Sequence, residues 1–252
     1  MFTVYLCELL KLRRKKIVRM IMLVSILLPA FSFALCMHNR YRFRNLVGMN
    51  ILFGSFLVAP FLFSLILVTL FSMEMQNDTL KNILTTATSK TEILLSKVGA
   101  ALTFVMVYSA VNCLYTLIGG AFLGISFSFM VKALGALFIT AIAAVCGTAP
   151  VLLIVIAYHK KHLLALILTN CFVMIDFLFV WQLTMFQGLD LQVPICIAYR
   201  ITYPLSIVEY TENLQSGLDT LYYPISYGTL LLLAALSVSV VGSILVYNRQ
   251  EV

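Results

Sequence analysis

The chain has 252 residues, of which 62% are hydrophobic and 11% are charged, and its mean hydropathy is +1.03. A soluble domain needs a far more polar surface, so this composition excludes a water-soluble enzyme and predicts a membrane protein. The net charge of +7 does not indicate nucleic-acid binding. Six of the seventeen Lys and Arg lie within residues 11–19, directly before the first apolar run. That position is typical of an anchor facing anionic lipid headgroups.

The first segment, residues 2–16, predicts an amphipathic helix in the membrane interface. At helical spacing, one face is apolar and the other is polar: Phe2, Tyr5, Leu6, Leu9 and Leu12 against Thr3, Glu8, Lys11, Arg14 and Lys15. A simple topogenic anchor is the alternative interpretation. A cleaved signal peptide is not expected, because the apolar run that follows is too long and lacks a small-x-small cleavage site.

Six apolar runs follow, and each is long enough to cross a bilayer, which takes about 20 residues. They predict an all-α, polytopic membrane protein with a single transmembrane domain over residues 1–252. The predicted spans are about 17–37, 49–72, 98–122, 132–157, 163–185 and 224–247. Gly147-Thr148-Ala149-Pro150 is expected to bend the fourth span. The longest connection is 186–223.

The distribution of Lys and Arg predicts the orientation. With the N-terminus in the cytoplasm, twelve of these residues are cytoplasmic and five lie on the other side. The positive-inside rule therefore predicts a multi-pass protein of the cell membrane with both termini cytoplasmic. The run Arg40-Tyr41-Arg42-Phe43-Arg44 on the outer side opposes this distribution.

Signatures of catalysis are missing from the sequence. It has no G-x-x-x-x-G-K-[ST], H-E-x-x-H or G-x-S-x-G pattern and no Gly-rich dinucleotide turn. His38, His159 and His162 all lie at span ends. We therefore predict no catalytic residue, no metal ligand and no cofactor in this chain, which is expected not to be an enzyme.

The polar connection 73–97 has a helical pattern. Asn77 or Asp78 can cap a helix that begins at Thr79, and Leu80, Ile83 and Leu84 then form an apolar patch beside Lys81. A capped helix with an exposed apolar patch favours docking into a groove on another protein. The alternative is a helical hairpin packed on its own bundle.

A second capping pattern follows in the same connection. Ser89-Lys90-Thr91-Glu92 is a capping box that predicts the start of the helix leading into the third span.

This layout resembles the membrane subunit (permease) of type-2 ABC transporters, whose members pair a basic amphipathic N-terminal helix with a Glu, a "TLK-x-L-L-T" segment and "S-[KR]…K" after the second span. The matching residues are Glu74, Thr79, Leu80, Lys81, Ile83, Leu84, Thr85, Ser89, Lys90 and Lys97. The sequence departs from the pattern at Asp78, where Gly is common, and at Ala87-Thr88, where Pro is usual. Neither departure destroys the helix pattern.

The resemblance implies that this segment is a coupling helix that contacts a separate ABC ATPase, present in two copies and carrying ATP and Mg²⁺. It also implies a second permease subunit, in a homo- or heterodimer, and short re-entrant helices between the last two spans. The chain is most similar to the short permeases of lantibiotic-immunity and bacitracin-type peptide exporters. Export of an antimicrobial peptide or another amphipathic substrate is therefore expected, and with it antibiotic or bacteriocin resistance.

Two other classes of function remain open at this point. One is an ATP-independent secondary transporter or channel, and the other is a non-transporting membrane scaffold.

Asp176, midway along the fifth predicted span, is the candidate for the substrate path, together with Asn170 six residues earlier. An ionisable group within a span is costly and normally faces the protein interior or a water-filled path. The alternatives are an Asp hydrogen-bonded to a neighbouring helix, or one that lies nearer the outer interface.

Overall fold

The computed structural model describes residues 2–39, 41–76, 89–125, 127–185, 192–206 and 223–249, and these contain helices and no strand. The helices are α1 (Phe2–Arg14), α2 (Lys16–His38), α3 (Phe43–Met49), the π-helix η1 (Asn50–Val58), α4 (Ala59–Gln76), α6 (Lys90–Phe122), α7 (Phe127–Gly147), α8 (Val151–Ala157), α9 (His162–Met185), α10 (Pro194–Ser206) and α12 (Ile225–Arg249).

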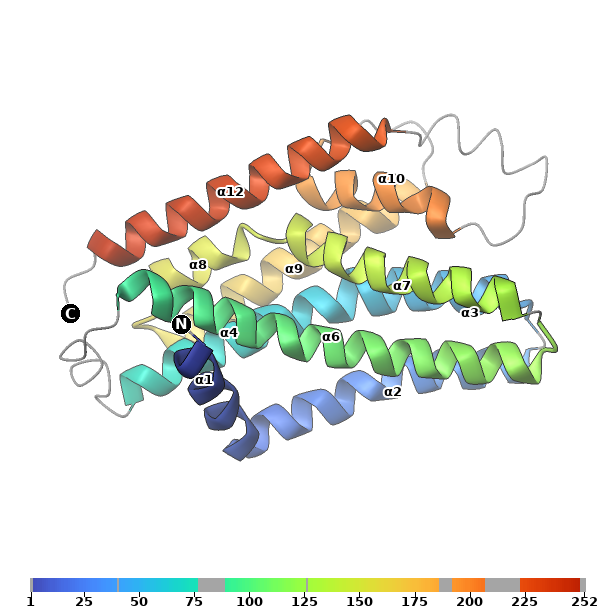
Figure 1. Cartoon of the computed structure of the whole chain (residues 1–252), viewed down its shortest axis with the longest axis horizontal. Helices are drawn as coiled ribbons and strands as arrows, with labels where there is room; N and C mark the ends of the chain where they lie inside the picture. The colour runs from blue at the N-terminus through green and yellow to red at the C-terminus, as the bar shows by residue number, and fades with distance from the viewer. Residues whose placement is uncertain are drawn as a thin grey trace.

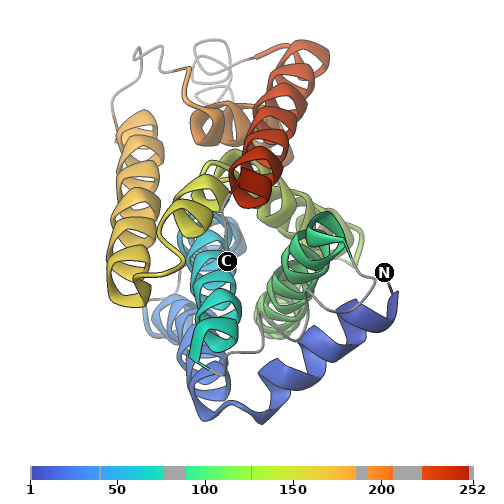
Figure 2. The same ribbon diagram turned by 90° about the vertical axis from the view of Figure 1, so that its left-hand side faces the viewer.

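Six of the described helical segments are long and apolar enough to cross a membrane, which confirms the predicted all-α class with six spans. They are Val18–His38, Phe43–Met73, Lys90–Phe122, Phe127–Gly147, His162–Leu183 and Ile225–Arg249. Within an apolar 18-residue stretch of each span, 67% of the residues are buried in the second span and 17% in the last, so the second span forms the centre of the bundle and α12 its edge. Figure 2 shows α12 and α9 at the outside of the bundle.

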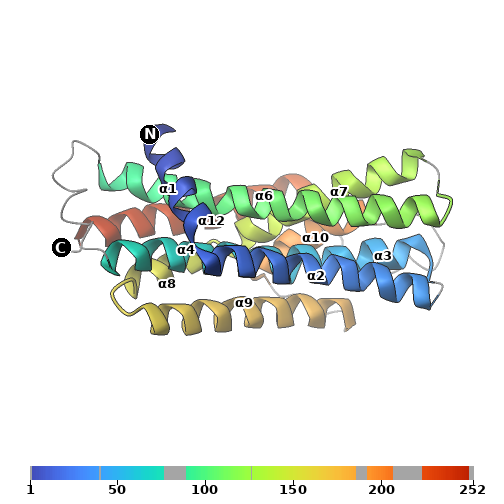
Figure 3. The same cartoon turned by 90° about the horizontal axis from the view of Figure 1, so that it is seen from below.

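The bundle has two ends that matter for function. Figure 1 shows α1, the end of α4, the start of α6 and the end of α12 at one end, which we call the α1 end. The opposite end, with α3 and the connection from α6 to α7, we call the α3 end. Helix α1 crosses the bundle axis at a steep angle and packs on α6 (Figure 3).

The second span is one continuous helix from α3 through η1 to α4, and its middle is wound as a π-helix. Pro60 explains where the π-helical turns end, because its ring lacks an N–H and would clash with the carbonyl of Phe56 in an α-helix. The wider turn ends with the N–H of Ala59 donating to the carbonyl of Gly54. Such π-helical turns within an α-helix are frequent at functional sites.

The fourth predicted span, 132–157, is divided in two. Helix α7 ends at Gly147, a turn follows at residues 148–150, and α8 continues to Ala157. The Ala144 carbonyl accepts the backbone N–H of Thr148 at 3.0 Å, and the Thr148 hydroxyl donates to the Ala144 and Val145 carbonyls at 3.2 and 3.1 Å, so these carbonyls at the end of α7 have partners.

Helix α10 begins beside this break and packs along α7 towards the α3 end (Figure 1). A Cβ atom on Gly147 would lie 2.8 Å from the Cα of Ile195 in the first turn of α10. Helix α10 has 13 residues and starts at about the middle of the bundle, which fits the short re-entrant helices that the resemblance implies.

We expect Gly147→Ala to destabilise the protein by about 1–3 kcal/mol, because the added methyl group meets backbone atoms of α10 that cannot rotate away. The matched control is Gly135→Ala on the same helix, where a Cβ meets nothing within 4 Å. That variant should keep or slightly raise stability, since Ala favours a helix over Gly. Thermal unfolding of the purified chain checks both, and equal melting temperatures for the two variants would contradict close packing at Gly147.

Candidate functional site

The predicted coupling segment is only partly within the described residues. Thr79, Leu80, Lys81, Ile83, Leu84 and Thr85 lie outside them, and the backbone of Glu74 belongs to α4. Ser89 and Lys90 lie at the start of α6. The last residue of α4, Gln76, and the cap residue Ser89 both lie at the α1 end (Figure 1). The segment is therefore attached at that end of the bundle on both sides.

The predicted cap of the third span is confirmed. The Ser89 side chain accepts a hydrogen bond of 3.2 Å from the backbone N–H of Glu92, and Glu92 lies in the first turn, where a carboxylate is favoured by the helix dipole. Helix α6 has 33 residues and is about 50 Å long at 1.5 Å per residue, which exceeds the hydrocarbon thickness of roughly 30 Å. Part of α6 therefore extends beyond the membrane core.

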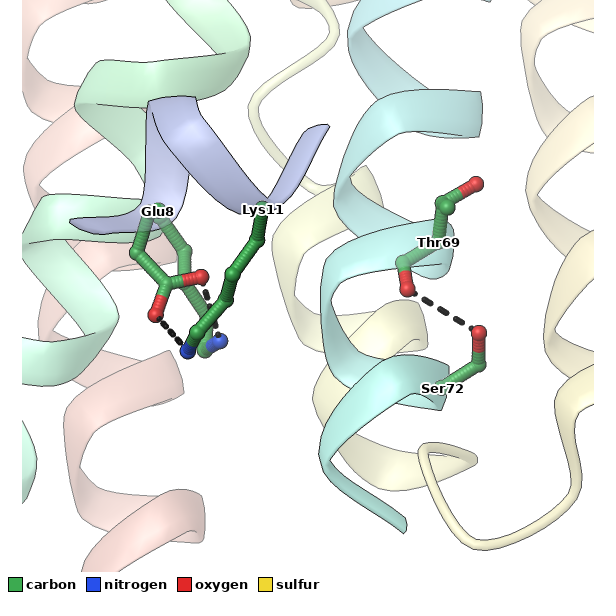
Figure 4. Close-up of polar contacts among 5 residues, drawn as sticks. Glu8, Lys11, Thr69 and Ser72 are labelled. Carbon is green, nitrogen blue, oxygen red and sulfur yellow. Dashed lines mark hydrogen bonds and ion pairs between the residues drawn. The ribbon is translucent and has the colours of Figure 1, made fainter. Parts of the chain in front are cut away.

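A buried ion cluster joins α1 to α6 just beyond this cap. Glu8 and Lys97 are 2% and 0% exposed, and the Lys97 Nζ atom lies 3.3 Å from the Glu8 carboxylate. The other carboxylate oxygen of Glu8 accepts a hydrogen bond of 2.6 Å from Lys11 (Figure 4). The sequence interpretation that placed Glu8 on an outward polar face is thus wrong. The physical reason is that two ammonium groups compensate the buried carboxylate.

Lys97 also connects this cluster to α4 at the centre of the bundle and, through α4, to α12 at its edge. Its ammonium group lies 5.3 Å from the centroid of the Phe71 ring in α4, within the range of a cation–π interaction. Phe71 in turn makes an edge-to-face contact with Tyr247 of α12, with ring centroids 5.9 Å apart. Four helices, α1, α4, α6 and α12, are therefore linked where the predicted coupling segment begins and ends.

Some of the other side chains of α1 contact the bundle, and others are exposed on its surface. The Tyr5 hydroxyl is 2.7 Å from the Thr103 hydroxyl of α6, and Leu12 is fully buried. Phe2 and Leu6 are exposed. Only part of the predicted apolar face therefore contacts the bundle, and two of its five members are left for the membrane or a partner.

Asp176 is buried in α9 and faces the bundle interior, with a residue exposure of 3%. Its Oδ2 atom has no hydrogen-bond partner among the described residues, and the same holds for Oδ1 of Asn170. No hydrogen bond joins the two side chains in the described part of the chain, so the structure does not bring these two predicted residues together. The lipid-facing side of α9 carries Met174, Ile175 and Leu178 instead.

Helix α10 contributes a buried thiol and a buried cation, Cys196 and Arg200. Arg200 is 7% exposed, and its guanidinium carbon lies 5.4 Å from the centroid of the Tyr223 ring. Arg200 is one of the five Lys and Arg that the predicted orientation places on the outer side, and its burial could not be predicted because it depends on how α10 packs.

A buried polar network connects η1 with α6 and α7. The Asn50 amide donates to the Thr116 hydroxyl at 2.9 Å, and the Asn112 amide donates to the Asn50 carbonyl at 3.2 Å. On the other side of η1, the Thr140 hydroxyl donates to Ser55 at 3.2 Å. Sequence analysis did not single out these residues, although an Asn within each of two apolar runs was a usable signal.

A cavity of about 360 Å³ opens at the α3 end between α3, η1, α9 and α10. Its lining residues are Arg44, Asn45, Gly48, Met49, Ile51, Leu52, Phe53, Trp181, Tyr199 and Tyr203. Phe53 and Trp181 contact each other, with ring centroids 5.7 Å apart, as do Tyr199 and Tyr203 at 5.6 Å. Four of the ten lining residues are thus aromatic, and Arg44 supplies the positive charge.

These features describe a membrane-spanning helical bundle with four helices linked at the α1 end and a break in the fourth span. The family model of the ABC-2 family transporter proteins matches residues 5–176, which covers α1 through most of α9. No curated protein and no solved structure matches the chain. Because the family match covers more than half of the 252 residues, the chain belongs to the ABC-2 family of transporter proteins and is a membrane permease subunit that works with an ABC ATPase.

Proposed function

We propose that this permease exports an antimicrobial peptide or another amphipathic substrate, driven by ATP–Mg²⁺ bound on the partner ATPase. The membership in the ABC-2 family carries the proposal, together with the lack of a nucleotide-binding pattern in the sequence. The substrate class rests on the resemblance of the sequence layout to the short permeases of lantibiotic-immunity and bacitracin-type exporters.

The coupling site is proposed at residues 74–90, with Leu80, Ile83 and Leu84 as the apolar patch that docks on the ATPase. The end of α4 at Gln76 and the cap of α6 at Ser89 lie at the α1 end, where the buried pair of Glu8 and Lys97 joins α1 to α6. A displacement of this segment would act on α4 and α6 directly, on α1 through the pair of Glu8 and Lys97, and on α12 through the ring contact of Phe71 with Tyr247. Packed helices then shift between two arrangements rather than deforming continuously.

The α1 end is proposed to be cytoplasmic, with both termini on that side. The excess of Lys and Arg in the sequence supports this orientation. Two ATPase copies and a second permease, identical or different, complete the proposed assembly.

Asp176 is proposed to act on the substrate path through its charge. The observation behind it is a buried carboxylate on α9 whose Oδ2 has no hydrogen-bond partner among the described residues. We expect Asp176→Asn to fold normally and to reduce transport by about tenfold or more, since it removes the charge and keeps the shape. Unchanged transport by a normally folded Asp176→Asn variant would contradict this role.

Reconstitution into proteoliposomes tests the proposed function. The permease and its ATPase together should move a lantibiotic-type peptide with ATP and not with a non-hydrolysable analogue. Deleting the permease should make cells more sensitive to the same peptide. An ion-gradient-driven flux by the permease without any ATPase would overturn the proposal.

A further inference from the structure

The cavity at the α3 end has a combination of features that the coupling mechanism does not use. Its volume of about 360 Å³ lies at the small end of the range for ligand sites, so it has room for a head group or part of an acyl chain and not for a folded peptide. Arg44 is the charged member of the lining, and the described lining residues include no carboxylate. The cavity therefore matches a small anionic group joined to an apolar body.

The aromatic side chains that line the cavity are held in place by contacts with other aromatic rings. Phe53 lies 5.8 Å from Phe177 and 5.7 Å from Trp181, measured between ring centroids. On the opposite wall Tyr199 packs edge-to-face on Phe56 at 5.3 Å. Trp and Tyr are enriched at the level of lipid headgroups because their rings are partly apolar and partly polar. The cavity is thus built of the side chains that suit this depth of a bilayer.

Gly48 leaves the floor of the cavity open. A Cβ atom at this position would meet nothing within 4 Å, and Gly48 is among the lining residues. A larger side chain here would fill the cavity without striking the bundle. Asn45, one turn earlier on α3, is exposed at the same cavity and supplies an amide.

The basic run 40–44 gives an independent reason to expect an anion. The run lies towards the α3 end, which is the outer side in the proposed orientation. The positive-inside rule disfavours Lys and Arg on that side, so topology alone does not explain this basic run. Arg42 occupies the N-cap position of α3 and is exposed, whereas Arg44 is half-buried at the cavity. A guanidinium presents paired N–H donors that match the oxygens of a phosphate.

From these observations we propose that the cavity between α3, η1, α9 and α10 binds the phosphate of a membrane lipid head group, with Arg44 as the anion ligand and the walls of Phe53, Trp181 and Tyr203 around the adjoining apolar part. The site holds an anionic phospholipid in preference to a zwitterionic one. It needs neither ATP nor the ATPase, so its test is separate from that of the proposed transport function.

Trp181 provides a direct probe, because it is the one Trp of the chain and it lines the cavity. The chain is reconstituted into vesicles of unlabelled phosphatidylcholine. One preparation also contains brominated phosphatidylglycerol, and the other contains brominated phosphatidylcholine. Brominated acyl chains quench Trp fluorescence on contact. At equal lipid content, we expect brominated phosphatidylglycerol to quench Trp181 about five- to tenfold more effectively than brominated phosphatidylcholine. This ratio is the gain in affinity expected from one charge-assisted interaction of Arg44 with the phosphate. Equal quenching by the two lipids would overturn the proposal.

Two pairs of variants locate the effect. Arg44→Gln should remove the preference for phosphatidylglycerol, whereas Arg42→Gln, two residues away and outside the cavity lining, should keep it. Gly48→Leu should reduce quenching by phosphatidylglycerol to the level of phosphatidylcholine, whereas Gly135→Leu, also in open space, should leave it unchanged. Equal loss in Arg42→Gln and Arg44→Gln would show general attraction to surface charge and would contradict a site at Arg44.

A soluble competitor separates a lipid head group from a free phosphate. Glycerol phosphate added at millimolar concentration should leave the quenching by phosphatidylglycerol unchanged, because the apolar part contributes to binding. Full competition by glycerol phosphate would assign the site to a soluble anion and overturn the lipid assignment.

Discussion

Leu84→Asp is expected to abolish ATP-driven transport and the co-purification of the ATPase, while the permease still inserts into the membrane. A carboxylate in place of an apolar side chain at a docking surface would have to be buried without a partner. Loss of one central apolar anchor and burial of this charge together cost about 3 kcal/mol or more, which is roughly a hundredfold in affinity. Transport with the ATPase in proteoliposomes and pull-down of the ATPase measure the two effects.

The matched control is Leu84→Met, which keeps an apolar side chain of similar volume and should retain ATPase binding and transport. Membrane insertion is followed by the amount of each variant in the membrane fraction. If Leu84→Asp still binds the ATPase and transports at the wild-type rate, the apolar patch of Leu80, Ile83 and Leu84 is not the docking surface.

Glu8→Gln is expected to destabilise the α1 end by about 3 kcal/mol, because it removes the carboxylate beside the fully buried ammonium group of Lys97. For a chain of this size, that corresponds to a fall of about 6–12 °C in melting temperature. The same variant should also lower transport, since the ion cluster links α1 to α6 next to the proposed coupling segment. Thermal unfolding in detergent and the proteoliposome assay check the two results.

Lys11→Gln is the control for this effect. Lys11 binds the same carboxylate at 2.6 Å, but its side chain is 36% exposed, so its loss should cost under about 1 kcal/mol. The double variant Glu8→Leu with Lys97→Met removes both buried charges and should recover much of the lost stability. Similar, small effects of Glu8→Gln and Lys11→Gln would mean that burial of the pair does not matter for stability.

Features set by local sequence were predictable. Apolar runs of sufficient length gave the six spans, and Ser89 three residues before Glu92 gave the start of α6, because span length and capping depend on neighbouring residues alone. The turn at residues 148–150 follows a Gly and precedes a helix that starts after Pro150, so its position was also visible.

Features set by packing between helices were not predictable. The burial of Glu8 depends on Lys97, which is 89 residues away in the chain. The π-helical winding at Asn50–Val58 involves contacts with α6 and α7 that no periodicity reveals. The cavity beside Arg44 exists because α10 packs against η1 and α9 at the α3 end, so the sequence showed its basic run and its aromatic residues only as separate features.

The proposed coupling requires that residues 79–90 contact the ATPase from the cytoplasmic side. A photo-crosslinking amino acid at residue 83 tests this contact directly in cells that express both subunits, with Phe127 at the α3 end as the control position. We predict a crosslink to the ATPase from residue 83 and none from residue 127. A crosslink from residue 127 without one from residue 83 would contradict both the orientation and the coupling role.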